Sequence, residues 1–208
     1  NEGTLPSTAM VRIGDVVNSE TENIYRQLAG GLTTASLLHG SANPIGGQNQ
    51  VIKLRWGEAP DDLKFKDAPA GIKFALGENV KQSNWGDDRK TRFPQTRMGV
   101  RTFFNNRFTA ARQYLDAIKK DKAIDPPIRR NLELEALGEI IEAKRWIHCH
   151  SYRQDEMLIF LRTMERFGVT VGTLQHVLEG YKIADEIATH GAGASAFSDW
   201  WAYKFEVY

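Results

Sequence analysis

The sequence lacks several features that would define a class of function. It contains one cysteine in 208 residues, Cys149, which excludes an intrachain disulfide framework and a cysteine-rich zinc or iron–sulfur site. A single cysteine suits a reducing cytosol and a disulfide-free exported protein equally, so the compartment stays open. No apolar run approaches the roughly 18 residues of a membrane span, and the first seven residues do not resemble a signal peptide. These absences predict a soluble chain.

An excess of charge of either sign is also missing. The chain has 27 Lys and Arg against 26 Asp and Glu, which gives a formal net charge of +1. Because no net field would draw the protein onto nucleic acid or an anionic bilayer, we predict no nucleic-acid partner and no membrane partner. With 41% hydrophobic and 25% charged residues the composition is that of an ordinary globular protein, and the length predicts one domain over residues 1–208.

The common catalytic fingerprints are absent as well. The chain has no Gly-x-Ser-x-Gly elbow, no Walker phosphate loop, no Gly-x-Gly-x-x-Gly and no His-Glu-x-x-His. Without a dinucleotide fingerprint, an oxidoreductase is set aside. The sequence begins with Asn1 rather than Met, so we expect that an upstream segment has been removed.

The first quarter of the chain is predicted to form a helix, a strand and a loop. Ser19 and Glu22 have the spacing of a capping box and predict a helix over residues 19–29. The mostly apolar residues 32–38 predict a strand that is covered on both faces. The glycine-rich residues 39–48 follow as a loop, which we expect to form the wall of a site.

The rest of the chain alternates between strand and helix patterns. Strands are predicted at residues 51–55, 71–76, 146–150, 169–174 and 192–197. An apolar stripe at helical spacing predicts a helix from near residue 98, which ends at residues 125–127. Further helices are predicted over 128–144, 154–167 and 178–189. This alternation predicts right-handed βαβ crossovers and a parallel sheet.

Three of the five histidines lie at or beside the ends of predicted strands. His148 and His150 are two residues apart, so they share one strand face while Cys149 points the other way. His176 ends the next strand, which brings it beside the pair at the carboxyl edge, where α/β folds build their sites. We expect His148 and His176 to reach one metal-sized site, with His150 one layer removed. The alternative is that one or two of them are hydrogen-bonded structural histidines.

A lysine within an apolar strand is the second unusual feature. A buried ammonium group is costly unless it is paired, neutral or modified. Lys73, between Ile72 and Phe74, fits this description better than Lys53 does. We expect Lys73 to project into the interior at the histidine end, with Ile72 and Phe74 facing the surrounding helices. For Lys53, an edge strand that lets the lysine reach water is an equally good interpretation.

Other residues near the histidines have simpler explanations. Cys149 could be a nucleophile, but strand alternation turns its sulfur away from the histidines. Glu179, three residues after His176, could support that histidine, although a solvated glutamate in a first helical turn is the simpler interpretation. Trp200 and Trp201 form an apolar pair suited to core packing or to a partner surface.

Five segments together resemble the amidohydrolase superfamily, especially its imidazolonepropionase-like bacterial branch. They are residues 31–34 (GLTT), 40–48 (GSANPIGGQ), 72–79 (IKFALGEN), 148–150 (HCH) and 175–176 (QH). The resemblance spans nearly the whole chain, and the combination is more specific than any single segment. It implies an α/β fold, the (β/α)₈ TIM barrel, with one or two divalent ions at the carboxyl ends of the strands. It also implies that a metal-bound water attacks an amide, a cyclic amide or a related carbon centre.

The resemblance also assigns roles to individual residues. Lys73 matches the lysine of the fourth strand, which is carboxylated and bridges the two ions in two-metal members of the family. His148 matches the ligand on the fifth strand and His176 the ligand on the sixth, and His150 is a further metal-ligand candidate. The implied cofactor is a divalent metal, Zn²⁺, with one or two ions in the complete enzyme, because neutral imidazole suits a borderline ion.

The chain departs from the family at both ends. It lacks the His-x-His pair of the first strand and the metal-binding aspartate of the eighth. The opening helix and strand match barrel unit two, and residues 192–197 match unit seven. A complete barrel needs about 250 residues, which agrees with truncation. We therefore expect an incomplete (β/α)₈ TIM barrel of parallel strands, roughly units two to seven, that is inactive alone.

These observations lead to one main hypothesis and one alternative. The main hypothesis is a fragment of a metal-dependent hydrolase that cleaves an amide, cyclic amide or peptide-like C–N bond in a small-molecule or peptide-like substrate. The alternative is a non-catalytic binding or scaffold domain of the same fold, with structural histidines. Unpaired sheet edges would favour a homo-oligomer or association with the missing segments.

Overall fold

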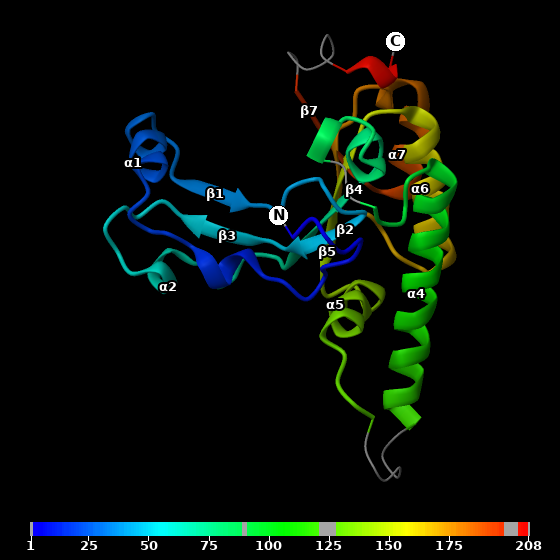
Figure 1. The fold of residues 1–208 in the computed structure, drawn as a ribbon. Helices are drawn as coiled ribbons and strands as arrows, with labels where there is room; N and C mark the ends of the chain where they lie inside the picture. The colour runs from blue at the N-terminus through cyan, green and yellow to red at the C-terminus, as the bar shows by residue number, and fades with distance from the viewer. Residues whose placement is uncertain (1, 89–90, 121–127, 198–203, 208) are drawn as a thin grey trace.

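The computed structural model describes residues 2–88, 91–120, 128–197 and 204–207 (Figure 1). Its centre is a five-stranded sheet with the strand order β2-β4-β5-β6-β7. The strands are β2 (Ile45–Gln48), β4 (Gly71–Ala75), β5 (Trp146–Ser151), β6 (Thr173–His176) and β7 (Gly193–Ala196). The pairs β4–β5, β5–β6 and β6–β7 are parallel, which confirms the predicted βαβ alternation over this part of the chain.

Helices form the connections between the parallel strands. α3 (Glu78–Lys81), α4 (Arg97–Lys120) and α5 (Leu132–Ile141) lie between β4 and β5, α6 (Gln154–Arg166) between β5 and β6, and α7 (Ala184–His190) between β6 and β7. Short 3₁₀ turns complete the fold: η1 (Ile13–Val16), η2 (Gly86–Asp88), η3 (Gly180–Ile183) and η5 (Phe205–Val207). Figure 1 shows α4, α6 and α7 along one side of the sheet.

Aromatic side chains join this helical layer to the sheet. Phe74 of β4 is fully buried and stacks on Phe104 of α4, with ring centroids 5.6 Å apart and planes 9° apart. It also contacts Phe160 of α6 at 6.3 Å. Side chains alternate between the two faces of a strand, so Phe74 defines the helix-covered face and Lys73 belongs to the other. The prediction that Phe74 faces the helices is confirmed.

The glycine-rich segment contains a strand rather than only a loop. β2 runs antiparallel to β4, with Ile45 opposite Phe74 and Gln48 opposite Ile72. A Cβ atom at Gly46 would lie 2.8 Å from the carbonyl oxygen of Lys73. Glycine is therefore needed at this position because the two strands approach so closely. The prediction of uniformly parallel strands is wrong here.

The predicted strand at residues 32–38 does not join the central sheet. β1 (Thr34–Leu37) pairs antiparallel with β3 (Gln50–Lys53) in a separate two-stranded ribbon. Its residues alternate between exposed and half-buried, so the expectation of a strand covered on both faces is wrong. The ribbon extends away from the main sheet together with α1 (Glu22–Ala29) and α2 (Pro60–Leu63) (Figure 1). The opening helix and strand therefore do not form the second parallel unit that we expected.

Several element boundaries also differ from the sequence analysis. The predicted capping box does not form. α1 begins at Glu22 with Thr21 as its N-cap, so Ser19 lies outside the first turn. Thr21 itself makes no side-chain capping hydrogen bond. α5 begins at Leu132 rather than near residue 128, and the side chain of Asn131 caps it by accepting from the amide of Leu134. The predicted helix at residues 178–189 divides into η3 and α7.

The fold is mixed α/β with a mostly parallel central sheet, which is consistent with a partial (β/α)₈ barrel. Within the described residues the sheet does not close on itself: β2 and β7 are its outermost strands, and only isolated bridges from Ser7 and Arg12 reach the outer side of β2. Residues 125–127, Trp200 and Trp201, which entered the sequence analysis, lie outside the described residues. Among the described helices, none is both long and apolar enough to cross a membrane.

Candidate functional site at the carboxyl ends of the parallel strands

The sheet face opposite Phe74 carries a row of polar side chains. In the ladder Lys73 pairs with His148, and His148 with Thr173. One step towards the carboxyl end, His150 pairs with Ala75 and with Gln175. Because in-register neighbours point to the same side of a sheet, these side chains form two successive layers.

His150 and His176 form the closest histidine pair that the structure describes. Their ring centroids lie 4.5 Å apart with an interplanar angle of 68°. His150 is 2% exposed, and its Nδ1 atom is buried with no hydrogen-bond partner among the described residues. We expected His148 to share a site with His176. The structure instead brings His150 next to His176 and places His148 one layer earlier on β5.

The backbone at the end of β6 accounts for this difference. His176 pairs in register with Ser151, not with His150, and strict alternation would turn it to the side opposite Gln175. His176 has φ of +67° and Val177 has φ of +45°, both in the left-handed region. This region is rarely occupied by residues other than glycine and is costly for a β-branched valine. The turn rotates the imidazole of His176 back towards His150.

Lys73 lies inside the protein near these rings. The residue is 5% exposed, and its Nζ donates a hydrogen bond to Oε1 of Gln175, the residue before His176. Burial lowers the pKa of Lys73 to about 8. Lys53 instead lies on the separate ribbon, with Nζ 4.5 Å from the ring centroid of Phe65. The expectation that Lys73, rather than Lys53, belongs near the histidines agrees with this arrangement.

Burial favours the neutral form of all three histidines. Burial lowers the pKa of His148, lowers that of His150 well below its usual value, and lowers that of His176 to about 4. The positive charge of Lys73 lowers all three pKa values further. Neutral imidazole is the form that binds a metal ion, so the chemistry of these donors fits a divalent cation.

The described residues do not by themselves complete a metal centre. No group of three or more His, Cys, Asp and Glu side chains with metal-binding geometry is found in residues 2–88, 91–120, 128–197 and 204–207. The donors that converge are two imidazoles, His150 and His176, together with the amine of Lys73. They fit part of a site.

Sequence reasoning missed the two residues that pack around His150. Nδ2 of Asn79 lies 3.2 Å from Nε2 of His150, and Asn84 in turn donates to Oδ1 of Asn79 at 2.6 Å. Tyr152, which is 1% exposed, places its ring edge-on to His150 with centroids 4.5 Å apart. Asn79 stands within the polar stretch after β4, and a hydrogen-bonding amide just beyond a strand end was the signal available in the sequence.

A buried charge cluster lies beside the site at the same edge. Arg97 at the start of α4 bonds to Glu156, and its Nη2 bonds to Glu206 at 2.8 Å. The carboxylate of Glu156 also accepts from the amide of Gly77 at 2.7 Å. The side chains of Glu156 and Glu206 are only 7% and 8% exposed. Glu156 therefore ties α6 to α4 and to the end of β4.

The two remaining candidates have structural roles. Cys149 is fully buried on the helix-covered face, and burial raises the pKa of its thiol, so its environment does not activate a nucleophile. Glu179 accepts a hydrogen bond from the amide of Gln154 at 2.9 Å and pairs with Lys182 at 2.6 Å. It therefore caps the start of α6 and makes no described contact with His176.

Two known proteins resemble this chain. It is 27% identical over 202 residues to the amidohydrolase tasK of Hapsidospora irregularis, a match that covers 86% of this chain and 20% of that protein. It also superposes on the crystal structure of an amidohydrolase from Thermotoga maritima MSB8 with a TM-score of 0.82 and 32% identity, over 95% of this chain and 50% of the other. No family model matches the sequence.

These similarities support a relationship to amidohydrolases in both sequence and fold. The likeness to the Thermotoga structure includes the arrangement of the elements, which agrees with the mostly parallel sheet described above. The chain spans about half the length of that solved protein and about a fifth of the length of tasK.

Proposed function

We propose that this chain carries part of the active site of a divalent-metal-dependent hydrolase of the amidohydrolase superfamily, on its imidazolonepropionase-like branch. Its substrate would be a small-molecule or peptide-like compound with an amide or cyclic amide C–N bond. One observation carries the proposal: three neighbouring parallel strands bring Lys73, His150 and His176 together at their carboxyl ends. This is the edge of a parallel sheet at which catalytic residues gather.

The residues divide into ligands and supporting groups. His150 and His176 would supply imidazole nitrogens, with His148 as a further candidate one layer below. Lys73, whose pKa burial lowers to about 8, would hold part of its amine in the neutral form near pH 8, and this amine would add carbon dioxide to form the carbamate that the family resemblance implies, releasing one proton to solvent. Asn79 fixes the orientation of the His150 ring, as the outer partner of a metal-binding imidazole does.

A divalent ion at this position would supply Lewis acidity, which makes hydroxide available near neutral pH and polarises a carbonyl group. The surrounding protein contributes a dry environment. Tyr152 and His150 are each at most 2% exposed, and this burial strengthens the electrostatic interactions of any charge placed between the rings.

The experiment is metal analysis of the longer parent protein, purified without chelator, together with assays on amide, lactam and dipeptide substrates. We expect one or two equivalents of divalent metal and turnover of at least one substrate class. His150→Asn and His176→Asn should each lower the metal content. His190→Asn is the matched control, because His190 is a hydrogen-bonded histidine outside the site, with Nε2 accepting from the amide of Val171 at 2.9 Å. A metal-free parent without hydrolytic activity would favour a scaffold domain instead.

A further inference from the structure

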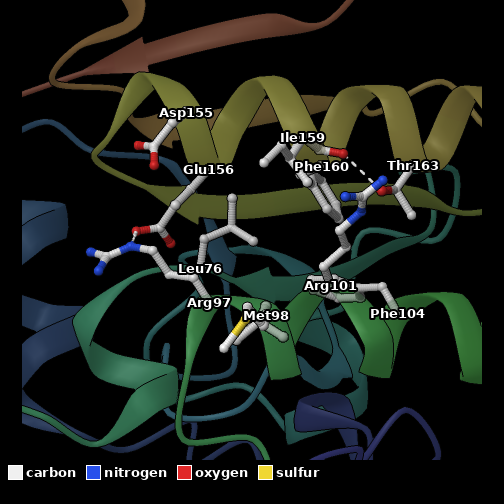
Figure 2. Close-up of a pocket in the computed structure, with 11 residues that line it drawn as sticks. Leu76, Arg97, Met98, Arg101, Phe104, Asp155, Glu156, Ile159, Phe160 and Thr163 are labelled. Atoms are coloured by element: carbon white, nitrogen blue, oxygen red, sulfur yellow. Dashed lines mark hydrogen bonds and ion pairs between the residues drawn. The ribbon is translucent and has the colours of Figure 1, made fainter.

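A cavity lies on the opposite side of the sheet from the histidines, between α4 and α6 (Figure 2). Its volume is about 180 Å³. Its apolar walls come from Leu76, Met98, Val100, Phe104, Ile159 and Phe160. Phe104 and Phe160 are the rings that pack on Phe74, so the cavity belongs to the outer helical layer and is separate from the proposed active site.

A second hollow continues from this cavity along the same two helices. It is lined by Arg101 of α4 and by Ile159, Arg162, Thr163 and Arg166 of α6. Arg101, Ile159 and Thr163 line both hollows, so the two hollows adjoin at these residues. Figure 2 shows the Arg101 side chain reaching towards Thr163 at the junction. We call the two adjoining hollows together the arginine groove.

The arginine groove has an excess of positive charge. In the part of the chain that the structure describes, no carboxylate lies within 4.0 Å of Arg101 or Arg162, while Arg166 bonds to the neutral amide oxygen of Asn105 at 2.7 Å. Arg162 and Arg166 are four residues apart on α6, a spacing at which like charges repel. An anion bound between these guanidinium groups would remove that repulsion.

The other end of the groove is electrically balanced. Glu156 is held by Arg97, and Asp155 is held by Arg153 at 3.0 Å. Asp155 and Arg166 are separated by three turns of α6, about 16 Å along the axis at 1.5 Å per residue. The groove therefore has a direction, with an apolar cavity beside neutralised charges at one end and, at the other, three arginines without an ion pair within 4.0 Å among the described residues. Arg162 also borders a separate hollow lined by Glu165, Asp185 and Glu186, on the side of α6 that faces α7.

We propose that the arginine groove binds a small monocarboxylate that carries an aromatic ring or a short branched alkyl group. The carboxylate would lie between Arg101 and Arg162, where the planar guanidinium groups can each donate two hydrogen bonds. The apolar group would enter the cavity between Phe104 and Phe160. An apolar cavity of about 150 Å³ is large enough to bind benzene in another protein, so the 180 Å³ here suits one ring.

The test uses 3-phenylpropionate as the probe, with binding to the 208-residue chain measured by isothermal titration calorimetry and by amide chemical shifts. We expect saturable one-to-one binding. The uncharged isostere 3-phenylpropionamide should bind at least tenfold more weakly to the same unmodified protein. Propionate, which lacks the ring, should also bind at least tenfold more weakly, because the cavity would stay empty.

Variants then assign the site. The double variant R101Q/R162Q should weaken 3-phenylpropionate at least tenfold, and I159W, at a position 41% exposed, should block binding by filling the cavity. Arg26→Gln is the matched control, since Arg26 is an exposed arginine on α1, far from the groove in sequence, and should leave affinity unchanged.

Three results would overturn the proposal. They are equal binding of acid and amide by the unmodified chain, unchanged affinity in a folded R101Q/R162Q variant, and concentration-dependent dimerisation through this face in place of ligand binding. The comparison of acid and amide needs no variant, so it decides the question even if a substituted chain does not fold.

Discussion

The imidazole rings of His150 and His176 meet at a centroid distance of 4.5 Å although the two residues are not opposite one another in the β5–β6 ladder. His150 pairs with Gln175, and His176 pairs with Ser151. The positive φ of His176 allows its ring to lie on the same side as His150. Left-handed backbone at a non-glycine residue costs on the order of 1–3 kcal/mol, and strained backbone of this kind concentrates at functional sites.

Metal affinity is the first prediction. The 208-residue chain alone should bind Zn²⁺ weakly, because two imidazoles and one amine are fewer ligands than tight zinc sites use. His150→Asn and His176→Asn should each weaken the remaining affinity about tenfold or more, while His190→Asn should not change it. Competition titration with a chromogenic zinc chelator measures this. Stoichiometric zinc that survives dialysis against a weak chelator would mean that further ligands lie within this chain.

The stability cost of Lys73 provides a second prediction. Burial disfavours its charged form, so removing the ammonium group relieves a desolvation cost, while the hydrogen bond to Gln175 is lost. The difference between these two energies predicts that Lys73→Met raises the free energy of unfolding at pH 7 by about 1–2 kcal/mol. Lys73→Arg should lower stability, because a guanidinium group cannot lose its proton. Urea unfolding followed by circular dichroism tests both variants. A destabilised Lys73→Met would show that the ammonium is better satisfied than its burial indicates.

The dependence of stability on pH is the third prediction. His150 and His176 have lowered pKa values in the folded chain, so below pH 6.5 the unfolded state binds more protons than the folded state does. The stability that depends on these histidines being neutral should therefore be fully present above pH 6.5. It should be lost as the pH falls towards about 4, the pKa of His176 in the folded chain. The midpoint of thermal unfolding should decrease over this window, and a His150→Gln/His176→Gln variant should show a flatter profile. Identical profiles for the two proteins would contradict this account.

Arg97 is the subject of the fourth prediction. Its guanidinium group compensates two buried carboxylates, Glu156 and Glu206, so Arg97→Ala should destabilise the chain by about 3–5 kcal/mol. Arg26→Ala is the control: Arg26 pairs with the single, exposed Glu22 and should cost about 1 kcal/mol or less. Chemical denaturation measures both. Equal losses in the two variants would mean that the buried cluster contributes no more than a surface ion pair.

The alternation of strands and helices from β4 onward was predictable from the sequence. Residues 71–76, 146–150 and 192–197 were predicted as strands, and β4, β5 and β7 form there, whereas the strand predicted at residues 169–174 forms later in the chain, as β6. The pattern is readable because each strand and helix buries one set of side chains against the same core, as Phe74, Phe104 and Phe160 do. Local periodicity records which face of an element is buried.

Pairing partners in the first quarter were not predictable in the same way. Residues 32–38 are apolar enough for a buried strand, yet β1 pairs with β3 in a half-exposed ribbon. Apolar composition indicates that a segment favours extended structure and does not state which strand will accept its hydrogen bonds. That choice depends on contacts between segments distant in the sequence, such as β2 against β4.

The sequence by itself determined which chemical groups would reach the carboxyl edge of the sheet: Lys73 on β4, His148 and His150 on β5, and His176 on β6. Only the tertiary structure decided which of them meet. Strand alternation favours His148 and His150 equally, since both point to one face, and the left-handed turn at His176 selects His150. The contacts of Asn79 with His150, and of Glu206 with Arg97, join segments 71 and 109 residues apart, so no local pattern could contain them.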